Sequence, residues 1–248
     1  MKWRVINEGE HSEAVHQALE EVLINRMNDG DMQPTFRIWR RPHASIPFGR
    51  FQSYQDEVEE DFVEKEGIEP VRRITGGGAM FSEPGNVITY SIYIPEDQVN
   101  SDVRKSYQQL DNFAVKTLRE IGVDVSYEPV NDIIHDSGKI GGAAQLRKGD
   151  VVLHHTMMSY DLNIERMLKA LRIGDEKVSD KAIESAEQRV SRIKNHTDIS
   201  RDRVIEKLIE KFTEGKEWEK GSLTDEELES ARKLASEKFE TDEWNKKM

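Results

Sequence analysis

The residues best suited to bind an anionic ligand form one glycine-rich segment, Arg72-Arg73-Ile74-Thr75-Gly76-Gly77-Gly78-Ala79-Met80-Phe81. Three consecutive glycines are costly in a helix or strand because each loses the most backbone entropy on ordering. The same freedom lets a backbone approach a ligand closely, and exposed N–H groups beside two arginines suit phosphate or carboxylate oxygens. The alternative is a glycine-rich hairpin with two surface arginines. No Gly-Lys-Ser/Thr follows at the spacing of a P-loop.

A second candidate segment places one lysine among small residues. It runs Asn131-Asp132-Ile133-Ile134-His135-Asp136-Ser137-Gly138-Lys139-Ile140-Gly141-Gly142-Ala143-Ala144. Small neighbours let a ligand lie against the backbone, where Lys139 supplies a point charge for a carboxylate or phosphate. Asp132 is a candidate either to offset that charge or to hold a metal. The alternative is a turn lysine without a ligand.

Two adjacent histidines, His154 and His155, lie on an expected strand. Neighbouring residues of a strand point to opposite faces of the sheet, so these two cannot easily share a metal. The chain has no cysteine, which excludes disulfides, cysteine metal ligands and a cysteine nucleophile. It also has no Gly-x-Ser-x-Gly motif. The sequence therefore gives little support to zinc or serine-hydrolase chemistry.

Grouped strands between helices are expected to position these segments. The periodicity predicts helices over 12–27 and 102–121, and strands over 36–39, 70–74, 87–94, 123–127, 133–135, 140–145 and 151–160. After about residue 163 we expect helices throughout: one near Met167 to Leu171, one capped by Ser179, one over 204–212, and one opened by a capping box at Thr224. Grouped strands favour an α+β fold with a mixed or antiparallel sheet. We expect a single domain over residues 1–248, with a helical C-terminal part from about 164.

The acidic composition disfavours nucleic acid and anionic membranes as partners. The 248 residues include 36 Lys and Arg against 48 Asp and Glu, a formal net charge of −12. An acidic chain is a poor candidate for non-specific binding to nucleic acid or anionic membranes. No apolar run approaches the roughly 20 residues that span a bilayer, and no apolar signal segment opens the chain. We therefore expect a cytoplasmic protein that binds neither nucleic acid nor membranes.

The motifs together resemble the signature of lipoate–protein ligases. The segment from Arg72 to Phe81, followed by Gly85-Asn86, is similar to the family's Arg-Arg-x-x-Gly-Gly-Gly-Ala-Val-Phe…Gly-Asn. Further similar stretches are Gly49-Arg50-Phe51-Gln52, Asn131-Asp132-Ile133, Gly138-Lys139-Ile140-Gly141-Gly142-Ala143-Ala144, Leu153-His154-His155 and Lys238-Phe239 to Glu243-Trp244. Their order and spacing agree over about residues 14–244. Two departures affect substrate contacts: Ser82-Glu83 replaces the family's usual His-Asp, and Thr156-Met157 replaces its Gly-Thr.

This resemblance implies an α+β catalytic domain related to biotin–protein ligases. Such a domain uses ATP and Mg²⁺ to convert lipoate into lipoyl-adenylate. It then transfers the lipoyl group to a lysine of an acceptor domain, in the E2 subunit of a 2-oxoacid dehydrogenase or in glycine-cleavage H protein. Because many ligases continue with a small C-terminal domain, which is a separate polypeptide in some members, the resemblance also implies a small accessory subunit.

The matching positions assign roles to particular residues. The resemblance implies that Arg73 and the backbone from Gly78 to Phe81 contact the nucleotide, and that Lys139 bridges the lipoyl carbonyl and phosphate oxygens as the catalytic residue. Asp132 becomes the candidate Mg²⁺ ligand. The full set implied for lipoate and ATP is Arg72, Arg73, Gly76, Gly77, Gly78, Ala79, Met80, Phe81, Asn131, Asp132, Lys139, Ala143 and His155. A basic rim of Arg72, Arg73 and Lys139 is expected to steer the acceptor.

Two alternatives remain. An octanoyl or lipoyl transferase has the same fold, but those enzymes form an acyl thioester on a cysteine, which this chain lacks. A non-catalytic module that binds lipoyl domains is the other alternative, and the presence of Arg73, the three glycines and Lys139 argues against it. A biotin–protein ligase is disfavoured because its Gly-Arg-Gly-Arg-x-Gly loop is missing.

Overall fold

The computed structural model describes residues 1–172, 185–186 and 189–247. Its centre is an eight-stranded sheet with the strand order β10-β1-β2-β5-β9-β8-β7-β6. The strands are β1 (Lys2–Ile6), β2 (Thr35–Trp39), β5 (Val87–Pro95), β6 (Val125–Glu128), β7 (Asp132–His135), β8 (Gly138–Lys148), β9 (Val151–Ser159) and β10 (Glu217–Gly221). β1 pairs in parallel with β2 and β10, whereas the remaining neighbours are antiparallel. The sheet is therefore mixed, as predicted, and the fold is α+β.

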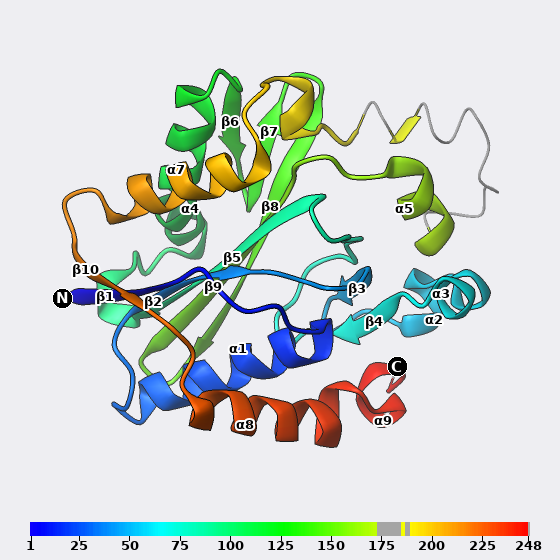
Figure 1. Ribbon diagram of the computed structural model, residues 1–248, viewed down its shortest axis with the longest axis horizontal. Coiled ribbons are helices and arrows are strands. Elements are labelled where there is room, and N and C mark those ends of the chain that lie inside the picture. Colours follow the sequence, from blue (N-terminus) through cyan, green and yellow to red (C-terminus); the bar gives the residue numbers. More distant parts are fainter. Residues whose placement is uncertain (173–184, 187–188, 248) are drawn as a thin grey trace.

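Two pairs of helices cover opposite faces of this sheet (Figure 1). On one face α1 (Glu13–Asn28) packs beside α8 (Asp225–Leu234), and on the other α4 (Val103–Glu120) packs beside α7 (Arg201–Thr213). Ser12 caps α1 by accepting a hydrogen bond from the Val15 N–H, and the predicted capping box at Thr224 forms with Glu227. Each face buries its own apolar core, one beneath α4 and α7 and one beneath α1 and α8.

A smaller layer stands at one end of the main sheet. Its two parallel strands are β3 (Ser45–Phe48) and β4 (Glu69–Arg72). Three short helices, α2 (Tyr54–Glu57), α3 (Glu60–Glu66) and α5 (Ile164–Ala170), share an apolar cluster with β3. Because β4 ends at Arg72, the glycine-rich segment leaves this small sheet and continues toward the large one.

The C-terminal region differs from the prediction of helices throughout. After α7 the chain forms β10, which pairs in parallel with β1 at the edge of the sheet. Its sequence, Glu-Trp-Glu-Lys-Gly, is mostly exposed, so it carries no apolar pattern that would reveal a strand. A turn of π-helix (Ala235–Phe239) and α9 (Asp242–Asn245) follow α8. Most of the helix predicted after Ser179 lies outside the described residues.

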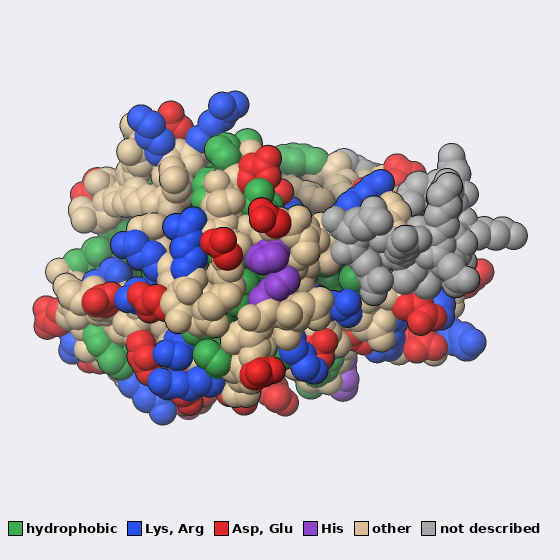
Figure 2. Space-filling model, turned by 90° about the horizontal axis from the view of Figure 1, so that it is seen from above, with side chains coloured by type: hydrophobic (Ala, Val, Ile, Leu, Met, Phe, Trp, Pro, Cys, Tyr) green, Lys and Arg blue, Asp and Glu red, His purple; other side chains and the backbone are tan. Residues whose placement is uncertain are grey.

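Charged side chains of both signs are interspersed over the face seen in Figure 2. Lysine and arginine do not gather there into a single basic patch. Among the residues that the structure describes, no helix combines the length and apolar character needed to cross a bilayer. This face is therefore mixed in charge.

Candidate active site

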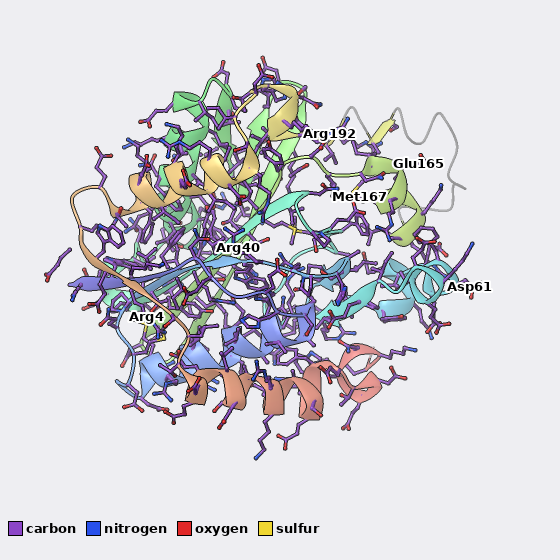
Figure 3. The ribbon with its side chains drawn as sticks, viewed as in Figure 1. Arg4, Arg40, Asp61, Glu165, Met167 and Arg192 are labelled. Atoms are coloured by element: carbon purple, nitrogen blue, oxygen red, sulfur yellow. The ribbon has the colours of Figure 1, made fainter. Side chains whose placement is uncertain are left out.

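A cavity of about 260 Å³ opens where the glycine-rich segment, β8, β9 and α5 meet. Its apolar wall includes Met157 of β9 and Met167 of α5, and Met167 lies on the side of α5 that faces the strands (Figure 3). The predicted site residues that line it are Arg73, Gly77, Gly78, Ala79, Met80, Phe81, Asn131, Lys139, Ala143 and His155. The two predicted segments, about 60 positions apart in the chain, therefore meet at one cavity.

The guanidinium of Arg73 fixes the backbone of the glycine-rich segment through hydrogen bonds to carbonyl oxygens. It donates to the carbonyl oxygens of Pro47 (2.6 Å), Gly76 (2.9 Å) and Gly78 (3.1 Å). Burial lowers the pKa of Arg73 to about 10, so it remains charged at neutral pH. In a planar trans peptide the carbonyl and the next N–H point in opposite directions. The N–H groups of Gly77 and Ala79 therefore point away from Arg73, as an anion-binding loop requires.

Two of the glycines are required for different structural reasons. Gly77 has a φ of +99°, a conformation that side chains other than glycine rarely adopt. A Cβ atom on Gly49 would lie 1.9 Å from the carbonyl oxygen of Gly77. The motif around Gly49 thus supports the glycine-rich segment by packing directly against its backbone.

Arg72, by contrast, is not brought to the cavity. Its guanidinium is buried and donates to five backbone carbonyls, those of Gly49, Arg50, Gln52, Trp244 and Asn245. It therefore fastens the C-terminal helix α9 to the loop after β3. The expected basic rim of Arg72, Arg73 and Lys139 is wrong, because backbone carbonyls enclose both arginines. Of these three residues only Lys139 is exposed, with a side-chain exposure of 45%.

Lys139 and Asp132 form an ion pair beside the cavity. The Lys139 Nζ lies 2.7 Å from Oδ1 of Asp132, which confirms that this carboxylate offsets the lysine charge. The lysine side chain passes over Gly142, where an added Cβ would come within 3.0 Å of its Cε and Nζ atoms. Backbone hydrogen bonds to Arg189 (2.8 Å) and Ser191 (2.9 Å) fix the strand that carries Lys139. The ammonium group is thus held in place yet open to a ligand.

The donor set near Asp132 fits a nucleotide-bound Mg²⁺ better than a resident metal. Within the described ranges, no group of three or more His, Asp or Glu side chains could hold a metal ion. Mg²⁺ is commonly bound by one or two carboxylates together with substrate phosphates, and it keeps several waters. Asp132 offers one such carboxylate, partly committed to Lys139. Its role as a magnesium ligand therefore stays a prediction.

The two histidines point to opposite faces of the sheet, as predicted. His155 contacts Glu20 of α1 through Nδ1 (3.1 Å) and the Thr75 hydroxyl through Nε2 (2.9 Å). His154 contacts Asp111 of α4 at 2.8 Å. Burial lowers the pKa of His155, so it is neutral at pH 7. His155 therefore ties the glycine-rich segment to the sheet beside the cavity.

Gly76 and Asp132 do not line the cavity wall, although both adjoin residues that do. The wall residues that the sequence interpretation missed include Gln17, Trp39 and Arg41. Gln17 lies beside the apolar stripe of α1, Trp39 ends a predicted strand, and Arg41 lies two residues beyond it. No local motif marks them, because only the packing of α1 and β2 against the sheet brings them to the cavity.

A family model described as the lipoyl protein ligase A/B catalytic domain matches residues 12–213. A lipoate-protein ligase A subunit 1 from Thermoplasma acidophilum is 29% identical, covering 92% of this chain and 90% of the relative. A probable lipoate-protein ligase A from Mycoplasma pneumoniae is 29% identical over 99% of this chain and 71% of its own length. An octanoyltransferase LipM from Clostridioides difficile is 28% identical over 99% of both chains.

Solved structures agree with these relatives. A bipartite lipoate protein ligase from Thermoplasma acidophilum, described with its E2 lipoyl domain, superposes with a TM-score of 0.89 at 28% identity, covering 99% of this chain and 96% of that one. A putative lipoate protein ligase from the same organism, with bound lipoic acid, gives 0.85 at 26% identity and full coverage of both chains. A lipoate-protein ligase A bound with ATP also gives 0.85 at 26% identity, covering 99% of each.

Proposed function

The chain belongs to the family of lipoyl protein ligase A/B catalytic domains, and we propose that it is an ATP-dependent lipoate–protein ligase. In the first step a carboxylate oxygen of lipoate attacks the α-phosphorus of ATP, and pyrophosphate leaves. In the second step the amine of an acceptor lysine attacks the acyl carbonyl, and AMP leaves. The observation that carries this proposal is the exposed Lys139 ammonium at an apolar cavity beside an anion-binding loop.

Each part of the cavity suits one part of lipoyl-adenylate. Met157 and Met167 offer an apolar wall to the acyl chain. The N–H groups of Gly77 and Ala79 suit the phosphate, because Arg73 holds the preceding carbonyls on the other side of the loop. Lys139 suits the junction between the acyl and phosphate groups. There its charge stabilises the negative charge that develops in both steps.

The known ligands of two similar structures support this division. The similar structures with bound lipoic acid and with bound ATP together contain both substrates of the proposed first step. Bound Mg²⁺ would offset the phosphate charge, with Asp132 as its protein ligand. Because the adenylate is already activated, the second step depends mainly on positioning the incoming amine. The acceptor we propose is a lipoyl domain, by analogy with the Thermoplasma system.

A separate accessory subunit is a further part of the proposal. It is supported by the Thermoplasma acidophilum relative, which is named as subunit 1 of a lipoate-protein ligase A. In such an arrangement this chain performs transfer, and adenylate formation requires the partner.

Octanoyl transfer is the second candidate, because the match to an octanoyltransferase extends over 99% of both chains. The thioester route associated with transferases of this fold requires a cysteine, and this chain has none. Transfer would then have to pass directly from a thioester donor to the acceptor lysine. The ligase is favoured because its intermediate is a mixed anhydride, which needs no nucleophile from the protein.

The proposal is tested by mixing the full chain with ATP, MgCl₂, lipoate and a lipoyl domain, and measuring pyrophosphate release and acceptor mass. Two parallel reactions replace ATP and lipoate, one with prepared lipoyl-adenylate and the other with an octanoyl thioester. Transfer from the adenylate without pyrophosphate release supports a two-part ligase, and both activities together support a complete one. Transfer only from an octanoyl thioester would contradict the ligase and favour the transferase.

A further inference from the structure

The far end of the cavity wall contains two buried polar atoms that have no hydrogen-bond partner among the described residues. They are Oε1 of Gln17 and Nη2 of Arg41. Both residues line the cavity, and they are only 1% and 7% exposed. A buried polar atom without a partner costs about 1–3 kcal/mol. Such a pair at the wall of a binding cavity is therefore a candidate contact for the ligand.

Strand register places this pair far from Lys139. A row of residues facing one side of the sheet runs across the strands, from Gly142 to Met157, Thr89 and then Trp39. Gly142 lies beneath the Lys139 ammonium. Because neighbouring strands lie about 4.8 Å apart and Thr89 is two strands away, Thr89 is roughly 10 Å from Gly142. Arg41 donates to the Thr89 hydroxyl at 3.0 Å and its guanidinium lies 4.8 Å from the Trp39 ring.

This separation matches the length of a medium acyl chain. Three backbone bonds of an extended chain span 3.3–3.6 Å, so the seven carbon–carbon bonds of an eight-carbon acid span roughly 8 Å. With its carboxyl end at Lys139, such a chain places its last carbons beside Thr89 and Arg41. The two unpartnered atoms would then face the end of the chain rather than its middle.

One carboxylate fixes the orientation of both side chains. Glu13 accepts from Gln17 Nε2 through Oε1 (2.8 Å) and from Arg41 Nε through Oε2 (2.5 Å). Rotating the Gln17 amide by half a turn would set its oxygen against the Glu13 carboxylate, so this rotation is disfavoured. The Ser45 hydroxyl also donates to Oε2 of Glu13 (2.8 Å). The pair, here called the polar floor, thus presents one fixed acceptor, Gln17 Oε1, and one fixed charged donor, Arg41 Nη2.

We infer that this polar floor selects acyl groups that carry hydrogen-bonding atoms at their far end over plain saturated chains of equal length. This inference rests on the proposed function, which identifies the ligand as a carboxylic acid with an acyl chain. A dithiolane sulfur accepts from Arg41, and a reduced dithiol also donates to Gln17. The methyl end of octanoate satisfies neither atom. Lipoyl rather than octanoyl substrates are therefore expected.

The test is calorimetric binding of lipoate, dihydrolipoate and octanoate to the full chain without ATP or acceptor. We expect octanoate to bind at least about fivefold more weakly than lipoate, the ratio that one unsatisfied buried group produces. The variant Gln17→Leu should remove the extra affinity for dihydrolipoate over lipoate. The paired variant Glu13→Gln/Arg41→Met should reduce the preference for lipoate over octanoate. Gln108→Leu, on the exposed face of α4, is the matched control and should keep every ratio.

Equal wild-type affinity for lipoate and octanoate would overturn the inference, as would no binding of either acid. Unchanged ratios in both folded variants would overturn it as well, because the preference would then come from buried area or from a water on the polar floor. Selective binding by a chain that neither releases pyrophosphate nor transfers the lipoyl group from lipoyl-adenylate would contradict the proposed ligase but keep this inference. A chain that ligates lipoate to the acceptor but binds lipoate and octanoate equally would support the ligase and overturn this inference.

Discussion

Strand β9 carries a histidine–carboxylate pair on each of its faces. On the α4 face, the sealed cluster consists of His154, Asp111, Tyr90 and Thr156, all of them at most 1% exposed. Asp111 Oδ1 accepts from Tyr90 (2.6 Å) and Thr156 (2.7 Å), and it lies 2.8 Å from His154. On the α1 face, a second buried cluster, here called the loop-linked cluster, consists of His155, Glu20, Arg37 and Tyr93, with Glu20 at its centre.

The difference lies in what each cluster contacts next. The sealed cluster joins α4 to the sheet, and a helix pair covers it. The loop-linked cluster joins α1 to the sheet, and its His155 contacts Thr75 of the glycine-rich segment. Residue types alone therefore do not distinguish a structural pair from one that supports a site. The two are distinguished by the segment that packs against each cluster.

The largest effect is expected in the sealed cluster. Asp111→Ala leaves three buried polar groups without their common partner, so the free energy of unfolding should fall by about 3–5 kcal/mol. Transfer by the molecules that remain folded should be unchanged. Urea unfolding at low temperature, with transfer measured at the same temperature, checks both. A large loss of transfer with normal stability would show that this cluster supports the site.

On the cavity side of the sheet we expect a large loss of transfer activity with little change in stability. Lys139→Met should lower kcat/KM for transfer from lipoyl-adenylate by about 10²–10³, because one charge-stabilising group is lost. Stability should hardly change, since the side chain is 45% exposed. Lys105→Met, an exposed change on α4, is the control. Near-normal transfer by the Lys139 variant would remove the lysine from the proposed chemistry.

A smaller effect is expected from the link between His155 and the glycine-rich segment. Thr75→Val keeps the side-chain shape but removes the hydroxyl that contacts His155 at 2.9 Å. The loop should lose part of its fixed position, and KM for the adenylate should rise about fivefold. The value of kcat should stay close to that of the wild type. Equal kinetic constants for variant and wild type would show that the loop does not need this anchor.

The smallest effect concerns pH and the cavity face. Burial and the Arg37 guanidinium hold the pKa of His16 well below its usual value near 6.5. Its Nδ1 lies 2.9 Å from Arg37 Nη1, so this nitrogen must stay unprotonated. The unfolded chain therefore binds a proton that the folded chain excludes. Stability from this residue is complete above pH 6.5 and is lost as the pH falls below it.

Between pH 7.5 and 6.0 this loss amounts to about 0.8 kcal/mol for His16. His16→Gln should be less sensitive to acid than the wild type by that amount, measured as the free energy of unfolding at both pH values. His43→Gln, at an exposed position, serves as the control. The same slope in His16→Gln and the wild type would contradict the assignment of a neutral buried imidazole.

Much of this arrangement was predictable because it is local in sequence. Period-2 patterning placed His154 and His155 on opposite faces, and the small residues around Lys139 singled out a segment that lines the cavity. Arg72 was misassigned because its partners, such as Trp244 and Asn245, lie more than 170 positions away. β10 was missed because an exposed polar edge strand carries no apolar pattern. The polar floor was missed because its side chains meet only through the packing of α1.

In the proposed reaction this chain transfers a lipoyl group from the adenylate directly to the acceptor, without an acyl-enzyme intermediate. The most direct test mixes the chain with lipoyl-adenylate and a lipoyl domain and follows the intact masses of both proteins. We predict that the acceptor gains one lipoyl group on a lysine while the mass of the chain stays constant. Acceptor modification no faster than without the chain, or acylation of the chain before the acceptor, would contradict the claim.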